Sequence, residues 1–289
     1  MNNKPTLAQI TKELLATYNR LPRKNLGQHF LVDPQVLQRI IDAAEVTKDD
    51  LVVEIGSGLG VVTSEIAKQA GSVIAIEIDK ELISISRQVL KPFDNITFIS
   101  GDILKLDVSS LAAQPSTPNV SQFATAQRPT SYKIIGNLPY YITAPIIDKI
   151  LKAENKPELA VIMVQKEVAE RMSSAPGTKK YGSFSVFVQF YAEVQIHSLV
   201  SKSSFYPWPE VSSAVVVLRP YREQKYQVRD EKLFFDIVHA AFQQRRKQLK
   251  NSLKEYNLET CGINLSRRPE RLSIEEFVEI ANHCYNLKP

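Results

Sequence analysis

The sequence has few cysteines and no long apolar run, and each shortage excludes a class of protein. Its only cysteines, Cys261 and Cys284, lie outside any CxxC spacing, which leaves neither a zinc framework nor a disulfide scaffold. The longest unbroken apolar run is the six residues at 159–164, far short of the roughly 20 that span a bilayer. The N-terminus lacks the apolar segment and cleavage pattern of a secretory signal. These shortages predict a cytoplasmic protein without membrane association.

Neither sign of charge dominates the composition. The 36 lysines and arginines and the 31 aspartates and glutamates leave a net charge of +5, which alone is a weak indication of nucleic-acid binding. The placement of the charge is more informative. Residues 1–30 carry five basic and one acidic residue, residues 221–289 carry 13 and 10, and residues 31–220 carry 18 and 20. The positive excess therefore lies towards the two ends of the chain.

A regular alternation of apolar runs and amphipathic segments occupies the centre of the 289-residue chain. An amphipathic helix is expected over 7–18, and Asp33 and Pro34 are suited to start a second one as N-cap and first residue. Strands are then expected at 51–55, 72–77, 95–100, 132–136 and 159–164, with helices between them. This alternation is typical of right-handed βαβ units. It predicts an α/β fold with a mostly parallel, doubly wound sheet.

Three further segments complete the predicted architecture. Segments 183–194 and 212–219 resemble two long strands without a helix between them, which predicts an antiparallel hairpin at one sheet edge. After Pro220 the periodicity is helical, so we expect one domain over 1–220 and a small all-α domain over 221–289. Residues 112–131 contain three prolines, six serines or threonines and one charge, which predicts an exposed insertion.

A glycine-rich turn, Glu54-Ile55-Gly56-Ser57-Gly58-Leu59-Gly60, follows the first of these strands. Glycines there let the backbone approach a ligand at the positive end of a helix. Glu77 ends the next strand, 21 residues after Gly56, where a carboxylate can accept both hydroxyls of a ribose. The dinucleotide-binding fingerprint G-x-G-x-x-G would place its third glycine at position 61, which is Val61 in this chain. This mismatch argues against a nicotinamide-dependent dehydrogenase. The E-x-G-x-G-x-G form resembles the first motif of class I methyltransferases that use S-adenosylmethionine (SAM).

A second motif, Gly136-Asn137-Leu138-Pro139-Tyr140, ends the fourth predicted strand, at the sheet edge where open α/β folds place their sites. It resembles the N/D-P-P-Y/F motif of methyltransferases that act on amino groups of bases. The exocyclic amine of adenine is a poor nucleophile, because its lone pair is delocalised into the ring. The Asn137 side-chain oxygen and the backbone carbonyl of Leu138 or Pro139 can accept its two hydrogens and free the lone pair, while Tyr140 can stack on the base. A sulfonium methyl is already activated, so we expect no metal, and catalysis by orientation and preorganised electrostatics.

Eight short motifs occur in an order that strongly resembles the small-subunit ribosomal RNA adenine N6,N6-dimethyltransferases. They are LGQHFL at 26–31, EIGSGLG at 54–60, GNLPY at 136–140, QKEV at 165–168, YG at 181–182, FYPWP at 205–209, VSSAVV at 211–216 and FQQRRK at 242–247. The resemblance implies a Rossmann-like class I methyltransferase fold with a SAM-binding catalytic domain over 1–220. It also implies transfer of four methyl groups, two to each of two adjacent adenosines in the 3′-terminal hairpin loop of small-subunit (16S) rRNA.

The resemblance also implies the roles of individual residues. Glu77 would bind the ribose of SAM and Asp102 its adenine, and the target base would leave its stack to lie between Tyr140 and Phe205. Two positions depart from the pattern, because Asn is frequent where His29 stands and Pro is common where Trp208 stands. The implied catalytic group is Asn137, Leu138, Pro139, Tyr140 and Phe205, and the implied SAM contacts are Gln28, His29, Leu31, Gly56, Gly58, Glu77, Asp102 and Asn137.

Basic side chains at both ends of the chain are the expected RNA contacts. A charge run is usually a solvated helix face, but the helical domain of the resembling family faces rRNA. The expected partner is the rRNA of an immature small ribosomal subunit, bound by a monomer with a role in subunit biogenesis. The expected contacts are Arg23 and Lys24 beside the SAM loop, and Arg245, Arg246, Lys247 and Lys250 in the helical domain.

Two alternatives remain open at this point. A large-subunit rRNA adenine N6-methyltransferase of the macrolide-resistance type would share the fold and the NLPY motif, although residues 207–209 and 243–247 favour the small-subunit family. A non-enzymatic ribosome-assembly factor would keep the fold without the activity. Loss of the motif residues in the glycine-rich turn, at Glu77 or in NLPY would support an assembly factor without activity, and all of these residues are present.

Overall fold

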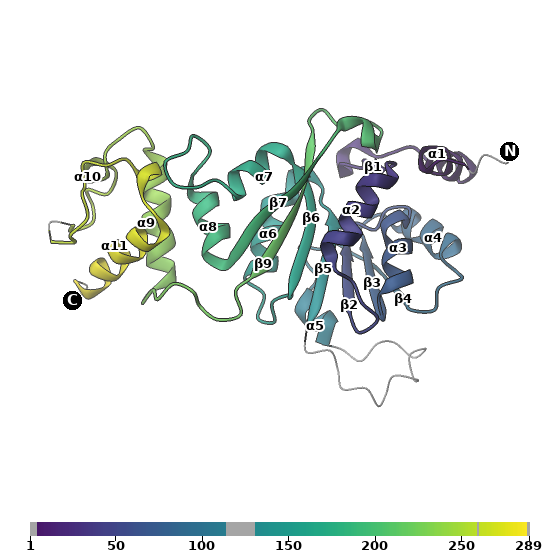
Figure 1. Ribbon diagram of the computed structural model, residues 1–289, viewed down its shortest axis with the longest axis horizontal. Helices are drawn as coiled ribbons and strands as arrows, with labels where there is room; N and C mark the ends of the chain where they lie inside the picture. Colours follow the sequence, from purple (N-terminus) through teal and green to yellow (C-terminus); the bar gives the residue numbers. More distant parts are fainter. Residues whose placement is uncertain (1–4, 114–130, 259, 288–289) are drawn as a thin grey trace. The chain divides into compact units, whose positions relative to one another are not determined.

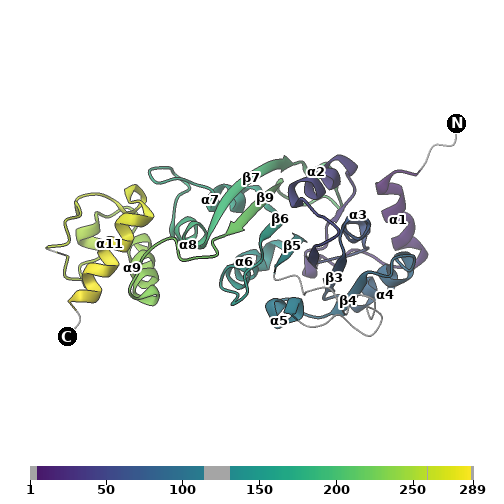
Figure 2. The ribbon, with the colours of Figure 1, turned by 60° about the horizontal axis from the view of Figure 1, so that its bottom comes forward.

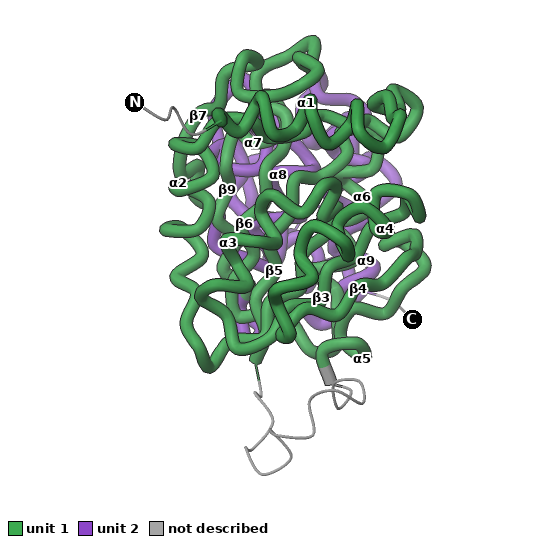
Figure 3. Tube along the Cα trace, turned by 90° about the vertical axis from the view of Figure 1, so that its right-hand side faces the viewer, with its two compact units in different colours: residues 1–169, 195–220 green, residues 170–194, 221–289 purple. Residues whose placement is uncertain are grey.

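The structure of the chain is a computed structural model that describes residues 5–113, 131–258 and 260–287. The insertion expected at 112–131 lies almost entirely outside the described residues. Backbone contacts divide the chain into two compact units, 1–169 with 195–220 (unit 1) and 170–194 with 221–289 (unit 2) (Figure 3). The expected boundary at residue 220 coincides with a boundary between these units. Residues 170–194, which we expected in the first domain, group with the C-terminal segment instead.

A mixed sheet forms the centre of unit 1, and its order within the described residues is β4-β3-β2-β5-β6-β9-β7 (Figure 1). β2 pairs in parallel with β3 and β5, β3 with β4, and β5 with β6, whereas β9 is antiparallel to β6. The predicted doubly wound, mostly parallel sheet is therefore confirmed. The strands are β2 Leu51–Ile55, β3 Ser72–Glu77, β4 Ile96–Ser100, β5 Tyr132–Asn137, β6 Leu159–Gln165, β7 Ala192–Val200 and β9 Ser213–Pro220.

Helices cover both faces of this sheet (Figure 2). Ile135 of β5 packs with Ile40 and Ile66 in the apolar core beneath α2 and α3. Ile134 precedes it in the strand and so points to the opposite face, where it lines a second pocket together with Ile146 of α6. The helices of this part of the chain are α1 Leu7–Thr17, α2 Pro34–Ala44, α3 Val61–Gln69, α4 Lys80–Val89, α5 Val108–Ala113, α6 Thr143–Leu151 and α7 Lys166–Met172.

The start of α2 follows from its first residues, as predicted. Asp33 is the N-cap, and its Oδ1 accepts hydrogen bonds from the backbone N–H of Gln35 at 2.9 Å and of Val36 at 3.3 Å. Pro34 occupies the first helical position, where a missing N–H is tolerated.

A two-stranded sheet joins two segments that lie far apart in the sequence. β1 (Phe30–Leu31) is antiparallel to β8 (Phe205–Tyr206), with Phe30 opposite Tyr206 and Leu31 opposite Phe205. Strands of two residues leave no readable alternation, so the sequence pattern does not predict this pairing. It attaches the LGQHFL loop to the FYPWP run.

The expected strand over 183–194 is wrong for most of its length, because helix α8 (Ser183–Tyr191) occupies it and β7 begins only at Ala192. The aromatic and β-branched composition favours a strand. However, Phe187, Phe190 and Tyr191 recur at helical spacing and pack on two phenylalanines of α9 (Glu231–Gln243), with ring centroids 5.6, 4.8 and 5.7 Å apart, respectively. Packing of one helical face has overridden the strand propensity. The predicted edge hairpin is therefore shorter, with β7 beside β9.

The described residues after 220 contain helices and no strand. They are α9 Glu231–Gln243, α10 Leu249–Ser252 and α11 Ile274–Asn286, in agreement with the helical periodicity. None of the described helices in the chain combines the length and the apolarity needed to cross a membrane.

Candidate active site

The sheet places the two sequence motifs side by side. The strand order reverses between β2 and β5, which is the point where doubly wound folds bind ligands. Ile55, the last residue of β2, pairs with Gly136 of β5, so Gly56 and Asn137 follow at the same edge. A Cβ atom on Gly56 would lie only 3.3 Å from the backbone oxygen of Asn137. The glycine is needed because these two segments approach so closely.

A pocket opens at this edge, with about 980 Å³ of space when its solvent-filled mouth is included. Its walls come from the LGQHFL loop, the glycine-rich turn, the start of α3, the end of β3 and the turns after β4 and β5. All eight residues that the resemblance assigns to SAM line this one pocket: Gln28, His29, Leu31, Gly56, Gly58, Glu77, Asp102 and Asn137.

Glu77 presents a buried and oriented carboxylate to the pocket. Its Oε2 accepts the backbone N–H of Gly58 at 2.9 Å, and its Oε1 accepts that of Asp79 at 3.0 Å. Gly58 has φ +54°, a left-handed conformation that glycine adopts readily. Burial raises the pKa of the Glu77 carboxyl, and the two N–H bonds offset only part of that effect.

Glu54 is a second buried carboxyl in the wall of this pocket. The sequence indicates it only as the first residue of the glycine-rich motif. Burial raises its pKa to about 8, and the nearby carboxylate of Glu77 adds to the rise. Its Oε2 makes no hydrogen bond of good geometry with a described residue, but the nearby Thr63 hydroxyl lowers the pKa. A carboxyl with a pKa of about 8 holds its proton at neutral pH, so it can donate a hydrogen bond to a bound ligand or accept one from it.

Asp102 lines the pocket from the turn after β4. Its Oδ1 accepts the backbone N–H of Leu104 at 3.0 Å. This bond holds the side chain against its own turn, so the carboxylate is presented at a fixed position in the wall.

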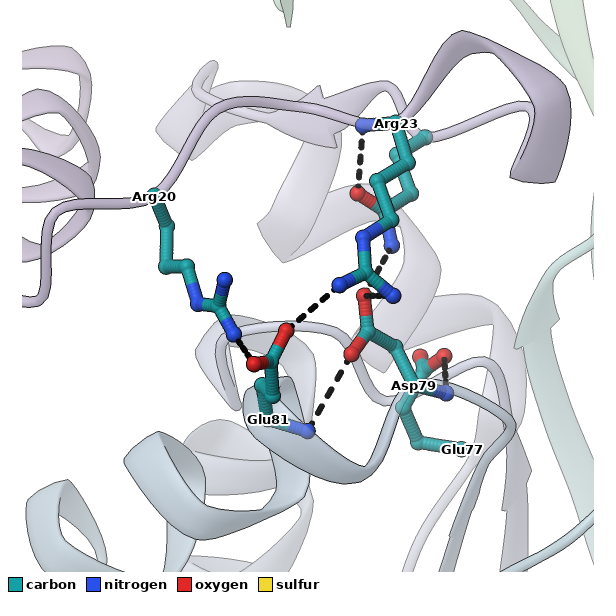
Figure 4. A network of polar contacts seen from close by, with 6 residues as sticks. Arg20, Arg23, Glu77, Asp79 and Glu81 are labelled. Carbon is teal, nitrogen blue, oxygen red and sulfur yellow. Dashed lines mark hydrogen bonds and ion pairs between the residues drawn. The ribbon is translucent and has the colours of Figure 1, made fainter.

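A network of polar contacts ties the N-terminal loop to the start of α4 (Figure 4). Nη1 of Arg23 lies 3.3 Å from Oδ2 of Asp79, and its Nη2 lies 2.5 Å from Oε2 of Glu81. Arg20 pairs with the other oxygen of Glu81. Nε2 of Gln28 donates to Asp79 at 3.0 Å, and its Oε1 accepts the backbone N–H of Arg23 at 2.8 Å. The loop is thereby fixed at the rim of the pocket.

This network gives two predicted residues a role that the sequence did not indicate. Arg23, expected at an RNA phosphate, contacts two carboxylates of α4, and Gln28 binds protein groups through both ends of its amide. Lys24, the residue after Arg23, has an exposed side chain. Asp79 is identifiable in the sequence as the N-cap of α4, but its long-range partners are not.

The NLPY turn leaves two hydrogen-bond acceptors at the end of β5. Nδ2 of Asn137 donates to the backbone carbonyl of His29 at 2.9 Å, so the side-chain oxygen is the free end of the amide. The Pro139 carbonyl already accepts two bonds from the following turn, at 3.1 and 3.2 Å. Among the described residues, no hydrogen bond ends on the carbonyl of Leu138. The Leu138 carbonyl is therefore the less occupied of these two acceptors, although Pro139 and not Leu138 is a lining residue of the pocket.

The aromatic residues of the site are arranged differently from the expectation. The Tyr140 ring stacks on His29, with centroids 5.9 Å apart and planes at 23°. Its hydroxyl lies 2.6 Å from Oγ of Ser213, and burial raises its pKa. Phe205 is only 1% exposed, in the apolar core with Leu31, and it is not in the pocket wall. The structure therefore brings Tyr140 to His29 and not to Phe205.

The predicted basic residues of unit 2 divide into two groups. Arg245 is half-buried, and its guanidinium donates to the backbone carbonyl of Lys179. Arg246, Lys247 and Lys250 are exposed. The structure therefore leaves three of these four cations open to a partner.

Comparison with known proteins agrees with this geometry. The family model described as ribosomal RNA adenine dimethylase matches residues 19–285. The chain is 41% identical over 285 residues to ribosomal RNA small subunit methyltransferase A of Listeria monocytogenes serotype 4a (strain HCC23), with 94% of each chain covered.

Two solved structures share the fold. A dimethyladenosine transferase from Plasmodium falciparum has a TM-score of 0.73 at 25% identity, with 89% of this chain and 98% of that one covered. The 23S rRNA methyltransferase ErmE has a TM-score of 0.67 at 24% identity, with 89% and 99% covered. From the family match and the identity to the Listeria protein, this chain belongs to the ribosomal RNA adenine dimethylase family.

Proposed function

We propose that this protein uses SAM to dimethylate N6 of two adjacent adenosines in the 3′-terminal hairpin loop of small-subunit rRNA. The family and the name of the Listeria relative support this activity. The structural observation that carries it is the placement of Asn137 beside Gly56 at the switch point of the sheet, in the wall of the pocket that also contains Glu77. A methyl donor in that pocket and an amine at Asn137 would be neighbours.

The residues that line the pocket are suited to bind SAM. The glycine-rich turn at Gly56 and Gly58 leaves no side chain where a ligand must approach the backbone, and Glu77 offers a carboxylate fixed by two N–H groups, as a ribose requires. When bound, SAM supplies an activated methyl group on its sulfonium. Glu54, whose buried carboxyl lies in the pocket wall, is a further hydrogen-bonding group for a polar atom of this ligand.

The acceptors of the NLPY turn orient and activate the target amine. The Asn137 side-chain oxygen and the Leu138 carbonyl accept the two N6 hydrogens, which draws the nitrogen lone pair out of conjugation with the ring. Both acceptors are fixed before the substrate arrives, Asn137 by its bond to His29 and Leu138 by its backbone N–H, which donates to Met163 at 3.1 Å. Catalysis by preorganised dipoles needs this rigidity. Tyr140 lies next in the turn as the ring that stacks on the base.

The remaining assignments complete the proposal. Residues 1–220 act as the SAM-binding catalytic domain and residues 221–289 as a helical RNA-binding domain, in which Arg246, Lys247 and Lys250 contact phosphates together with Lys24 of the N-terminal loop. Phe205 is the proposed second ring on the target base, and its burial requires a local shift when RNA binds. The protein acts as a monomer on an immature small subunit in the cytoplasm, with a role in subunit biogenesis.

Methyl transfer from labelled SAM to purified subunits tests this function. Small subunits from a strain without the endogenous methylation should accept methyl groups at the two adjacent adenosines, and fully methylated subunits should not. Label that appears only in large-subunit RNA would select the macrolide-resistance type of activity instead. No transfer to either subunit, from a protein that binds SAM, would support an assembly factor without activity.

A further inference from the structure

Trp208 is the only tryptophan of the chain, and its side chain is 71% exposed. It does not line the SAM pocket. A tryptophan left largely in water keeps a large apolar surface that a partner can cover. Neither the proposed chemistry nor the core of unit 1 uses this side chain.

The backbone beside Trp208 is fixed to the wall of the pocket. The Pro207 carbonyl oxygen lies 2.8 Å from Nδ1 of His29, and the His29 ring stacks on Tyr140 of the catalytic turn. Two residues before Trp208, Tyr206 is paired with Phe30 across the small β1–β8 sheet. Trp208 therefore directly follows the residue whose carbonyl contacts His29 in the pocket wall, and His29 in turn stacks on the ring of the catalytic turn.

Other features near this position favour an RNA partner. Tyr141 of the catalytic turn lines the pocket and is 57% exposed, so a second large ring is open to a partner at the pocket. Lys12 lies 5.2 Å from the ring centre of Tyr206 and is exposed, and so is Lys202, whose ammonium donates to the backbone carbonyl of Glu210. Exposed rings together with cations are how single-stranded nucleic acid is held, with bases stacked on the rings and phosphates near the cations.

We infer that Trp208 is a stacking platform for an unpaired base of the substrate RNA, next to the adenosine that enters the site. The inference rests on the proposed function, because it takes RNA as the partner. A flat indole can receive any base, so the contact adds affinity and holds the loop open, and the selection of adenine stays with Asn137 and Leu138.

The single tryptophan makes the test direct, because the intrinsic tryptophan fluorescence of the protein comes from Trp208 alone. The probe is a synthetic RNA hairpin with two adjacent adenosines in its loop, and the control is a fully paired duplex of the same length. Saturable quenching by the hairpin and not by the duplex is expected, since only an unpaired base can stack on the ring.

Variants measure the contribution of the ring to RNA binding and methyl transfer. For Trp208→Ala we expect RNA affinity and kcat/KM to fall about tenfold, and Trp208→Phe should restore most of both. SAM affinity should remain unchanged, which also shows that the variant is folded. Val89→Ala is the matched control, because Val89 is an exposed apolar residue, 39% accessible, at the C-terminal end of α4.

The outcomes separate this inference from the proposed function. Equal quenching by hairpin and duplex, a Trp208→Ala variant within about twofold of wild type, or a loss in Trp208→Phe as large as in Trp208→Ala would each overturn the stacking role. The titration needs no methyl transfer. A wild-type protein that quenches on the hairpin but methylates no RNA would therefore contradict the proposed function and leave the base contact standing.

Discussion

Glu77 shows how the chemistry of single residues shapes this pocket. Its carboxylate is fixed by two backbone N–H groups, yet burial keeps its pKa above the ordinary value. For Glu77→Gln we expect SAM to bind at least about tenfold more weakly, because an amide has one acceptor oxygen where the carboxylate has two. Isothermal titration calorimetry measures the change.

The same residue predicts a pH dependence of SAM binding. As the pH falls through the raised pKa of Glu77, the carboxyl gains a proton and loses an acceptor, so affinity should fall at pH values above the ordinary range of a glutamic acid. Glu77→Gln is the matched control, since it lacks the titrating carboxyl, so its weaker SAM affinity should not change over this pH range. An affinity that is independent of pH in both proteins would contradict the role given to Glu77.

Glu54 predicts a pH dependence of stability. Its pKa of about 8 in the folded chain lies above the ordinary value of 4.5, so the folded state holds this proton more tightly. The stabilisation is complete below pH 4.5 and is lost as the pH rises towards 8, with a slope of at most about 1.4 kcal/mol per pH unit in the free energy of unfolding. Urea denaturation at several pH values should show a shallower decline for Glu54→Gln than for wild type. Parallel profiles would refute the burial argument.

At the scale of elements, the loop that carries Arg23 and Gln28 is attached to α4 by partly exposed ion pairs (Figure 4). For Arg23→Ala we expect SAM affinity to fall about two- to fivefold, since largely exposed ion pairs contribute about 0–1 kcal/mol, and the buried Asp79 keeps its hydrogen bond from Gln28. The salt dependence of RNA binding should not change. A reduced salt dependence of RNA binding with unchanged SAM affinity would instead support the phosphate contact that the sequence predicts for Arg23.

The same scale shows what the sequence could and could not predict. The parallel strands, the N-cap at Asp33 and the motifs at the ends of β2 and β5 follow from periodicity and local chemistry, and the topology then brings Gly56 to Asn137. Contacts between distant segments leave no such pattern. The β1–β8 pair, the Arg23 network and the packing that makes residues 183–191 helical all depend on partners elsewhere in the chain.

At the scale of the whole molecule, the charge distribution agrees with the proposed division between a SAM-binding domain and an RNA-binding domain. The acidic residues of the central segment include Glu54, Glu77 and Asp102 in the pocket, whereas the exposed cations of unit 2 have the sign that phosphates require. Alanine at Arg246, Lys247 and Lys250 together should lower the slope of log K against log salt for RNA binding by about 2. Lys232→Ala, which removes an exposed cation already paired with Asp236, is the control. An unchanged slope in the triple variant would argue against this surface.

The most direct test of the activity counts methyl groups on the substrate RNA. Undermethylated small subunits are incubated with SAM and either wild-type protein or Asn137→Ala, and nuclease fragments of the 3′-terminal hairpin are weighed by mass spectrometry. SAM affinity of both proteins is measured in parallel, as a control for folding. We expect four added methyl groups on two adjacent adenosines with wild type, and a rate at least about a hundredfold lower with Asn137→Ala. Equal dimethylation by both proteins would contradict the role of the Asn137 turn as the catalytic centre.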